Sequence, residues 1–308
     1  MLVAAFFATH VIWGTTYLGM RIALESFPPF ATAASRFILA ALIGFVFAWQ
    51  QGVSWPTRSE WTSAAMIGCL LLVGGNGLVM WAMQRTPSGI TALIIASTPI
   101  WMTCFDWLFY RGPRPTRGVI FGLISGVIGI ALLVAKVDLF SSRDQFHYPS
   151  LVLIVLATLS WSFGALHSRH VALPKNILLV TAMESLVGGL ILLAVSYFGN
   201  ESQRMRWDRA SWEGIVAVIY LAIFGSLVSL SAYSWLLKQV SASVVSTHTF
   251  VNPLIALLLG WLVRNETIST QTALAIVFII LGVILIVFKR RTTSDQSQLA
   301  TSAPGDPS

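Results

Sequence analysis

The sequence predicts an all-α membrane protein in which ten transmembrane helices form two inverted five-helix repeats. The first observation is composition, since 56% of the 308 residues are hydrophobic, 10% are charged and the mean hydropathy is +0.77. Such a chain has too few polar side chains to cover a soluble domain of this size. The second observation is a series of ten apolar runs, each near the length of about 20 residues that crosses a bilayer. The third is an internal repeat.

The repeat is visible in two pairs of matching segments. Pro99 and Pro253 lie 154 residues apart, at corresponding places in two long apolar runs. Downstream, residues 129–136 (GIALLVAK) align without gaps with residues 282–289 (GVILIVFK), and half of the positions are identical. A repeat of five helices is odd-numbered, so the second copy enters the membrane in the opposite orientation. Apolar segments broken by proline at matching positions in two halves are typical of a transporter's substrate site.

The first repeat is expected to span residues 1–144. Its helices are predicted over approximately residues 2–24, 29–49, 61–83, 88–110 and 117–136. The connections contain turn-forming sequences such as Pro28-Pro29 and Gly112-Pro113-Arg114-Pro115, and most are short, which makes successive helices antiparallel neighbours. The first run has no basic leading segment and exceeds the core of a signal peptide, so we expect a retained helix.

The second repeat is expected to span residues 145–289. Its helices are predicted over approximately residues 150–170, 176–198, 212–237, 241–263 and 270–288. Residues 290–308 are polar and nearly without large apolar side chains, which is typical of a disordered tail.

The loop charges indicate how the chain crosses the membrane. With both termini in the cytoplasm, the inner segments hold ten Lys and Arg residues and the outer segments hold eight, and Arg36 lies within a helix. This excess predicts a multi-pass protein of the cytoplasmic (inner) membrane with cytoplasmic termini, including the tail. The basic residues responsible for the net charge of +7 lie at the ends of apolar runs. We therefore expect them to contact lipid headgroups and not a nucleic acid.

Several chemistries are missing from the sequence. It contains no Gly-x-x-x-x-Gly-Lys-Ser/Thr phosphate loop, and neither the His-Glu-x-x-His nor the Cys-x-x-Cys metal spacing. We therefore expect no ATP hydrolysis, no metal or other cofactor, and no enzymatic activity. The function classes that remain are a secondary transporter, which the repeats favour, and a channel or non-transporting membrane binding protein.

Polar residues within the apolar runs are costly in lipid and are candidate functional sites. Arg36 lies about 10 Å into its helix by the rise of 1.5 Å per residue, and the alternative for it is snorkelling to the headgroups. Glu184 matches Arg36 when Trp13 is aligned with Trp161, since both pairs are 148 residues apart. Its carboxyl is a candidate carrier of a coupling proton, with a structural hydrogen bond as the alternative. The candidate coupling or gating residues are Arg36, Glu184, Pro99 and Pro253.

The candidate substrate-binding residues combine aromatic and polar side chains in or near the interior of the runs. Aromatic rings can stack on a substrate ring or cation, or simply pack in the bundle. Asn76 stands in Gly74-Gly75-Asn76-Gly77, a sequence that permits local unwinding or a close helix crossing, and its amide offers both donors and acceptors. The set is Trp13, Asn76, Trp81, Ser97, Trp161, Tyr233, His248 and Asn252.

Four dispersed motifs carry a resemblance to a known family. They are Trp13-Gly14-Thr15-Thr16-Tyr17, Pro28-Pro29 followed by Arg36, Trp161-Ser162-Phe163-Gly164, and Asn252-Pro253 followed by Glu266. With these motifs the chain resembles the EamA-type members of the drug/metabolite transporter superfamily, and among them the YedA-like exporters. The resemblance covers residues 1 to about 289 and implies a central cavity lined mainly by helices one, three, four, six, eight and nine. It also implies export of small metabolites, amino-acid-like or drug-like, driven by protons or by exchange. The first repeat departs from the pattern, because it has Arg111-Gly112-Pro113 and no acid where the second has Glu266.

Overall fold

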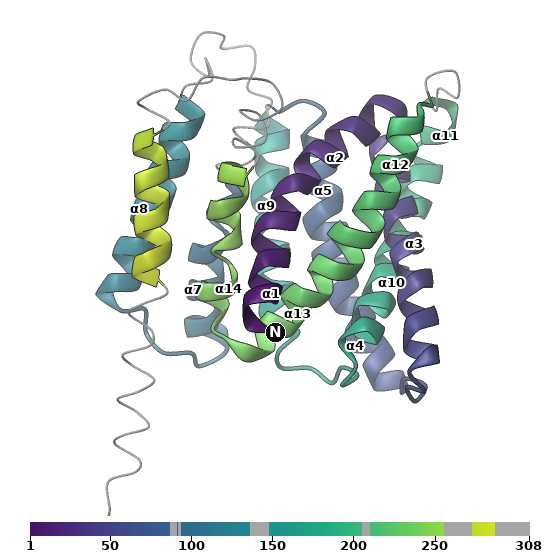
Figure 1. Cartoon of the computed structure of the whole chain (residues 1–308), viewed down its shortest axis with the longest axis horizontal. Coiled ribbons are helices and arrows are strands. Elements are labelled where there is room, and N and C mark those ends of the chain that lie inside the picture. Colours follow the sequence, from purple (N-terminus) through teal and green to yellow (C-terminus); the bar gives the residue numbers. More distant parts are fainter. Residues whose placement is uncertain (87–90, 92–93, 136–147, 205–209, 256–272, 287–308) are drawn as a thin grey trace, which may run out of the picture.

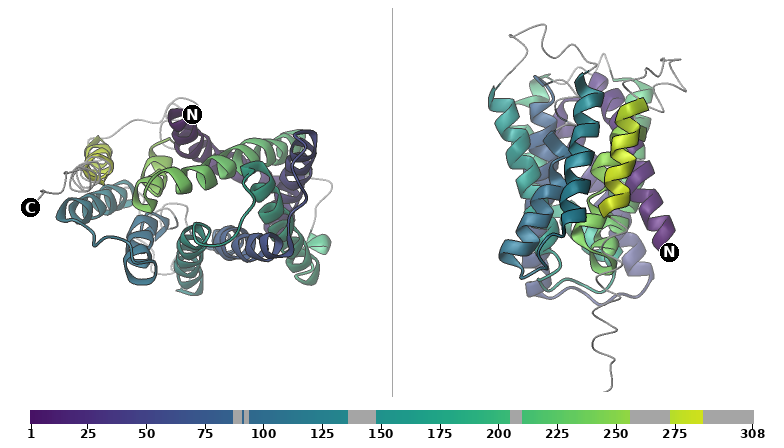
Figure 2. Two further views of the ribbon diagram at one scale, coloured as in Figure 1. Left: turned by 90° about the horizontal axis from the view of Figure 1, so that it is seen from below. Right: turned by 90° about the vertical axis from the view of Figure 1, so that its left-hand side faces the viewer.

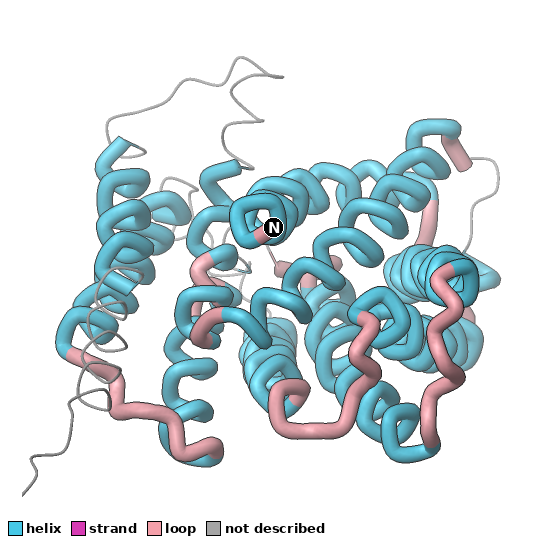
Figure 3. The backbone as a smooth tube through the Cα atoms, turned by 60° about the horizontal axis from the view of Figure 1, so that its bottom comes forward, coloured by secondary structure: helices cyan, strands magenta, loops and turns pink. Residues whose placement is uncertain are grey.

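The computed structural model describes residues 1–86, 91, 94–135, 148–204, 210–255 and 273–286. These residues form helices and short connections, with no strand among them. The helices stand roughly side by side in one bundle (Figure 1), and the view along the bundle shows them in cross-section (Figure 2, left). Short loops join them at the two ends (Figure 3).

The elements described in the first half of the chain form five helical stretches. They are α1 (Leu2–Phe7), η1 (Ala8–Ile12) and α2 (Trp13–Ser26) in one rod, α3 (Pro29–Gln50), α4 (Arg58–Gly68), η2 (Cys69–Gly77) and α5 (Leu78–Ala82) in a second rod, α7 (Thr98–Phe109) and α8 (Arg117–Ala135). Local sequence explains their starts. Pro29 occupies the first turn of α3, where its missing N–H costs nothing. Thr57 and Glu60 form a reciprocal capping box at the start of α4.

The second half contains a further series of helices. They are α9 (Tyr148–His167), α10 (Ile177–Phe198), the short α11 (Glu201–Arg204), one rod of α12 (Trp212–Tyr220), η5 (Leu221–Val228) and α13 (Ser229–Gln239), α14 (Ala242–Val245), and helical residues 248–255 and 273–286. Asn176 and Ser211 cap α10 and α12 through their side-chain oxygens.

Among the described residues, six helices are long and apolar enough to cross a membrane. They are Leu2–Ser26, Pro29–Gln50, Arg58–Ala82, Tyr148–His167, Ile177–Phe198 and Trp212–Gln239. The apolar helices Arg117–Leu132 and Ala273–Ile286 are shorter. Helix is present in the described part of each of the ten predicted runs, and the structure bears out an all-helical, multi-pass membrane protein. The predicted tail (290–308) and Glu266 lie outside the described residues.

Helices α3 and α10 pack against each other along their length in opposite directions. At one end the Asn176 side-chain nitrogen donates to Gln51 Oε1 at 2.8 Å. At the other end Glu201, just beyond α10, accepts from the backbone nitrogens of Phe30 and Ala31 at 3.2 and 2.9 Å. This pair is therefore antiparallel and is fixed at both ends.

The remaining stretches of the first half also contact partners in the second half. The C-terminal end of α2 meets the N-terminal end of α12 through Ser26 and Ser211, whose hydroxyls are 3.0 Å apart. Ser160 of α9 donates to the Leu70 carbonyl of η2 at 2.8 Å. A bond of 2.8 Å joins the hydroxyls of Thr103 on α7 and Ser243 on α14, and Ser125 of α8 donates to the Phe278 carbonyl at 2.8 Å. Figure 1 shows α8 beside the yellow helix that contains Phe278.

Candidate functional site

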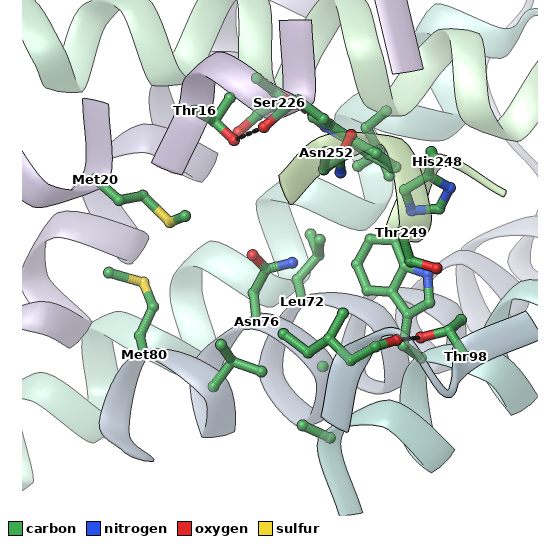
Figure 4. Close-up of a pocket in the computed structure, with 18 of the residues that line it drawn as sticks. Thr16, Met20, Leu72, Asn76, Met80, Thr98, Ser226, His248, Thr249 and Asn252 are labelled. Carbon is green, nitrogen blue, oxygen red and sulfur yellow. Dashed lines mark hydrogen bonds between the residues drawn. The ribbon is translucent and has the colours of Figure 1, made fainter. Parts of the chain in front are cut away.

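A cavity of about 130 Å³ lies in the middle of the bundle. It far exceeds the roughly 10–15 Å³ that one water molecule needs. Its lining comes from both halves of the chain: Trp13, Thr16, Met20, Arg36, Phe37, Leu72, Gly75, Asn76, Val79, Met80, Ile95, Thr98, Ala157, Thr158, Trp161, Gly225, Ser226, Leu230, His248, Thr249 and Asn252. Met20 and Met80 lie on one side of the open space and His248 and Thr249 on the other, with the Asn76 amide between them (Figure 4).

Three rods carry π-helical turns at or next to this cavity. η2 contributes Gly75 and Asn76, η5 contributes Gly225 and Ser226, and η1 ends directly before Trp13. A π-turn inserts an extra residue, which changes the direction of the side chains that follow and recurs at functional sites. The predicted unwinding at Gly74-Gly75-Asn76-Gly77 thus takes the form of a π-helix.

Two further helices are interrupted beside the cavity. Residues 96–97 form a turn directly before α7, so that Pro99 falls in the first turn of α7. Residues 246–247 form the second turn, six residues before Pro253. After it, the backbone nitrogens of Thr249 and Phe250 bond three residues back, at 3.1 and 3.0 Å. The second interruption is therefore associated with the Ser246-Thr247 pair and lies away from the proline.

An aromatic cluster forms one wall of the cavity. The Trp13 ring centroid lies 5.8 Å from that of Trp161, 5.1 Å from Tyr233 and 4.8 Å from His248. Trp13 and Trp161 line the cavity, whereas the Tyr233 side chain is completely buried behind them. Trp161 Nε1 donates to the Tyr233 hydroxyl at 3.1 Å. Tyr233 therefore positions Trp161 and does not itself line the cavity.

A polar network joins the first rod to the segment around His248. His10 Nε2 lies 3.1 Å from Thr247 Oγ1, and His248 Nδ1 lies 2.9 Å from the Val245 carbonyl oxygen. With its amide nitrogen turned toward the backbone, Asn252 donates to the carbonyls of His10 and His248, each at 3.0 Å. His248 and Asn252, both predicted from the sequence, line the cavity and share this network.

Arg36 turns inward. Its side chain is 5% exposed and lines the cavity, with Nε donating to Ser226 Oγ at 3.1 Å and Cζ lying 4.4 Å from the Phe37 ring centroid. The snorkelling alternative is not what the structure shows for this residue.

Glu184 does not line the cavity, although it matches Arg36 in the repeat. Its side chain is 1% exposed, and Oε2 has no hydrogen-bond partner among the described residues. The α4 backbone comes very close, since a Cβ atom at Gly68 would lie 2.5 Å from the Glu184 carbonyl oxygen. Leaving a buried carboxyl oxygen without a hydrogen-bond partner is costly.

Other predicted residues lie elsewhere. Trp81 lines a separate hollow of about 650 Å³ beside Ser26, Phe27 and Glu201. The Ser97 hydroxyl accepts from Trp101 Nε1 at 3.0 Å and donates to the Ile94 carbonyl. Neither these two residues nor Pro99 and Pro253 line the central cavity.

The sequence reasoning missed several cavity residues. These are hydroxyl-bearing or flexible side chains, namely Thr16, Met20, Thr98, Thr158, Ser226 and Thr249. Helical spacing could have found two of them, because Thr16 and Met20 follow Trp13 at i+3 and i+7 on the same face. Among the described residues, no group of three or more His, Cys, Asp or Glu side chains could hold a metal ion.

The fold and the cavity define a multi-pass α-helical membrane protein with a small, mostly apolar chamber between its two halves that also holds aromatic and a few polar side chains. The chain belongs to the EamA-like transporter family, whose sequence model matches residues 1–135 and again residues 149–288. The uncharacterized inner membrane transporter YedA of Escherichia coli K12 is 35% identical over 92% of this chain and 90% of its own length. The uncharacterized transporter YoaV of Bacillus subtilis is 23% identical over 90% of this chain and 94% of its own length. One solved crystal structure aligns with a TM-score of 0.74 at 18% identity, over 94% of this chain and 97% of that one, which shows a shared fold.

Proposed function

We propose that this protein is a secondary active transporter that exports small metabolites, amino-acid-like or drug-like, across the cytoplasmic membrane. The observation that carries this proposal is the central cavity, which is lined by both halves of the chain at π-turns and helix breaks. Non-helical backbone at membrane depth occurs where it lines a protein cavity, as in the broken helices of transporters.

The proposed architecture is two inverted repeats of five helices, residues 1–144 and 145–289. The helix contacts support it. The first rod pairs with the third stretch of the second half (Ser26 with Ser211), and the first stretch of the second half pairs with the third of the first half (Ser160 with Leu70). The second, fourth and fifth stretches pair with their own counterparts. If the labels of the two halves are swapped, the same helix pairs result. A pseudo-two-fold axis that relates the halves would give this pattern of pairs. The two family matches support the same division.

The proposed mechanism is alternating access. Met20 and Met80 place the cavity toward the bundle end that holds Ser26 and Ala82. The other end holds Ala5, Leu166, Leu236, Leu237, Ala242 and Val245, which belong to a buried apolar cluster that continues through the bundle to Met80 and Ala33. With cytoplasmic termini, the Ser26 end faces outward, and we propose that the cavity on this side represents an outward-directed state. Rocking of one repeat against the other would open the apolar cluster inward.

The proposed energy source is a proton gradient or exchange, with Glu184 as the coupling group. Its burial and its unpartnered oxygen support this role. Transport into proteoliposomes across a panel of metabolites, with and without an imposed pH gradient, tests the function. A transporter concentrates at least one substrate when the gradient or a counter-substrate is present. Single-channel currents from the purified protein in a bilayer would instead support the alternative of a channel.

A further inference from the structure

The guanidinium of Arg36 keeps most of its hydrogen-bonding capacity. Only Nε is engaged within the part of the chain that the structure describes, by Ser226 Oγ at 3.1 Å. Over the same residues, no acceptor binds either terminal nitrogen and no carboxylate pairs with the charge. Both terminal NH₂ groups, which form the planar fork that matches a carboxylate, therefore remain available on a residue that lines the cavity.

The charge of Arg36 is also left uncompensated. An arginine at membrane depth is costly, and those that are retained face a cavity or a partner of opposite charge. A hydroxyl and the Phe37 ring, 4.4 Å from Cζ, stabilise a guanidinium without neutralising it. A ligand that carries a negative charge would supply the missing counter-charge for the Arg36 guanidinium.

The cavity lining favours a single negative charge. Of the described residues that line it, Arg36 is the one with a permanent charge, and Glu184 lies outside. One carboxylate is balanced by one guanidinium, whereas a phosphate monoester, with a charge of about −1.5 to −2, is not. A substrate ammonium would meet no carboxylate in this lining.

The surroundings of Arg36 indicate where the rest of the ligand lies. Trp13 Nε1 donates to the Gly225 carbonyl at 2.8 Å, which holds the indole beside Ser226, the partner of Arg36. Thr16 lies on the same wall as Ser226 (Figure 4). A carboxylate on Arg36 therefore places the remainder of the molecule along Trp13 and Trp161.

We propose that the cavity binds a small organic monoanion, whose carboxylate is held by the terminal nitrogens of Arg36 and whose apolar or aromatic body packs on Trp13 and Trp161. The proposal rests on the proposed function and narrows its substrate class to acids that need no amino group. A charge-assisted pair in a partly dry site is stronger than the same contact with a neutral amide.

Equilibrium binding to the purified protein in detergent, measured by calorimetry, tests this assignment with 3-phenylpropionate, its uncharged amide and phenylalanine. The wild type should bind the acid about tenfold or more tightly than the amide, and phenylalanine no more tightly than the acid. Arg36→Gln should remove the preference for the acid and leave binding of the amide unchanged. Arg36→Lys should restore part of the preference, because it keeps the charge and loses the fork. Arg58→Gln, an exposed arginine at the start of α4, should behave as the wild type.

A preference for the acid that survives in Arg36→Gln overturns the proposal. The proposal is also overturned if the wild type binds the acid and the amide equally, or if it does not bind the acid. If Arg36→Gln fails to fold, the pH dependence of binding by the wild type tests the proposal instead. As the pH is lowered and the ligand's own carboxyl is protonated, the affinity for the acid should fall. The affinity for the amide should stay constant. A flat profile for the acid contradicts the proposal. Binding needs no translocation, so the two proposals fail separately. A protein that binds the acid but moves no compound of the metabolite panel in proteoliposomes would contradict the transport function and leave this proposal intact.

Discussion

Arg36 and Glu184 hold the eighth position of α3 and of α10, yet their surroundings differ. Arg36 lines the cavity beside Ser226, whereas Glu184 is buried against the Gly68 backbone with one oxygen unpartnered. Because α3 and α10 run in opposite directions, the two residues lie about a third of the way into the bundle from opposite ends. In an alternating-access cycle, the exchange of repeat conformations would bring Glu184 to the open side when Arg36 is closed off.

Glu184→Gln should separate binding from coupling. Glutamine keeps the shape and hydrogen-bonding capacity of the side chain and cannot ionise. We expect transport driven by a pH gradient to be lost, while substrate binding and exchange of internal for external substrate persist. Flux in proteoliposomes, with and without the gradient, measures this.

Glu213→Gln provides a matched control, since Glu213 is exposed in the first turn of α12. It should leave gradient-driven transport intact. If Glu184→Gln still concentrates substrate in response to pH, Glu184 has a structural role. His248 would then be the next candidate for the coupling group.

Tyr233→Phe should weaken substrate binding through Trp161. The change removes the oxygen that accepts from Trp161 Nε1 at 3.1 Å, a bond worth about 0.5–1.5 kcal/mol, so affinity should fall by roughly two- to tenfold. A double-mutant cycle with Trp161→Phe measures the coupling between the two side chains. If Tyr233 acts by positioning Trp161, the effects are not additive, whereas additive losses would mean that Tyr233 binds substrate independently.

At the residue scale, the sequence predicts the chemistry better than the orientation. Trp13, Asn76, Trp161, His248 and Asn252 are polar or aromatic residues within apolar runs, and all five line the cavity. Ser97 fits the same criterion but bonds within its own helix, while its neighbour Thr98 lines the cavity. A turn in a helix changes the direction in which the following side chains point. The sequence pattern alone therefore cannot tell which of two adjacent residues faces the cavity.

At the scale of elements, the side chain of Glu201, which belongs to α11, caps the N-terminus of α3. It is 5% exposed, accepts from Phe30 N and Ala31 N at the start of α3, and is held by the Ser196 hydroxyl at 2.8 Å. A carboxylate at a helix N-terminus satisfies unpaired N–H groups and complements the helix dipole. This contact fixes the connection after α10 to the first turn of α3.

Glu201→Ala should therefore lower the stability of the protein by about 1–2 kcal/mol, measured as a lower midpoint of thermal unfolding in detergent. Glu201→Gln should lose less, because its amide oxygen can still accept one bond. An unchanged midpoint for Glu201→Ala would show that water replaces the cap.

The alanine variants of Pro99 and Pro253 test the two helix breaks. Alanine at Pro253 restores an N–H within a helix, which should preserve or raise stability, whereas Pro99 lies in the first turn of α7, where a missing N–H costs little, so alanine there should leave stability nearly unchanged. Transport should fall if the break is needed for the helix to change shape between states. Pro99→Ala is expected to have the larger effect, because Pro99 lies in the turn of helix that follows the break at residues 96–97. Unchanged transport in both variants would reduce the prolines to packing residues.

Sequence could predict the existence of these breaks and not their position. In the second half the chain turns at Ser246 and Thr247, whose hydroxyls donate to the carbonyls of Ser243 and Val244 at 3.0 and 2.7 Å. Such side-chain bonds compete with the helix ladder without any proline. The π-turns η1 and η5 were equally hidden, because one extra residue barely disturbs an apolar run, whereas η2 contains the glycine-rich segment where unwinding was one of two alternatives.

At the scale of the whole molecule, the membrane class follows from composition and the arrangement of helices follows from their contacts. The chain has too few polar side chains for a soluble domain, and its long apolar runs indicate membrane helices. The structure bears out both conclusions. Which helix meets which depends on contacts between residues far apart in sequence, such as Gln51 with Asn176, and no local pattern encodes them. The inverted repeat could be proposed because its two copies keep recognisable similarity.

Trans-stimulation in proteoliposomes tests alternating access most directly. Labelled substrate is supplied outside and unlabelled substrate is loaded inside, without any ion gradient. A carrier that must reorient its single cavity should take up label faster when the inner side is loaded, because the return step with bound substrate is available. Uptake that is unaffected by internal substrate, together with measurable single-channel currents, would contradict alternating access and indicate a continuous pore.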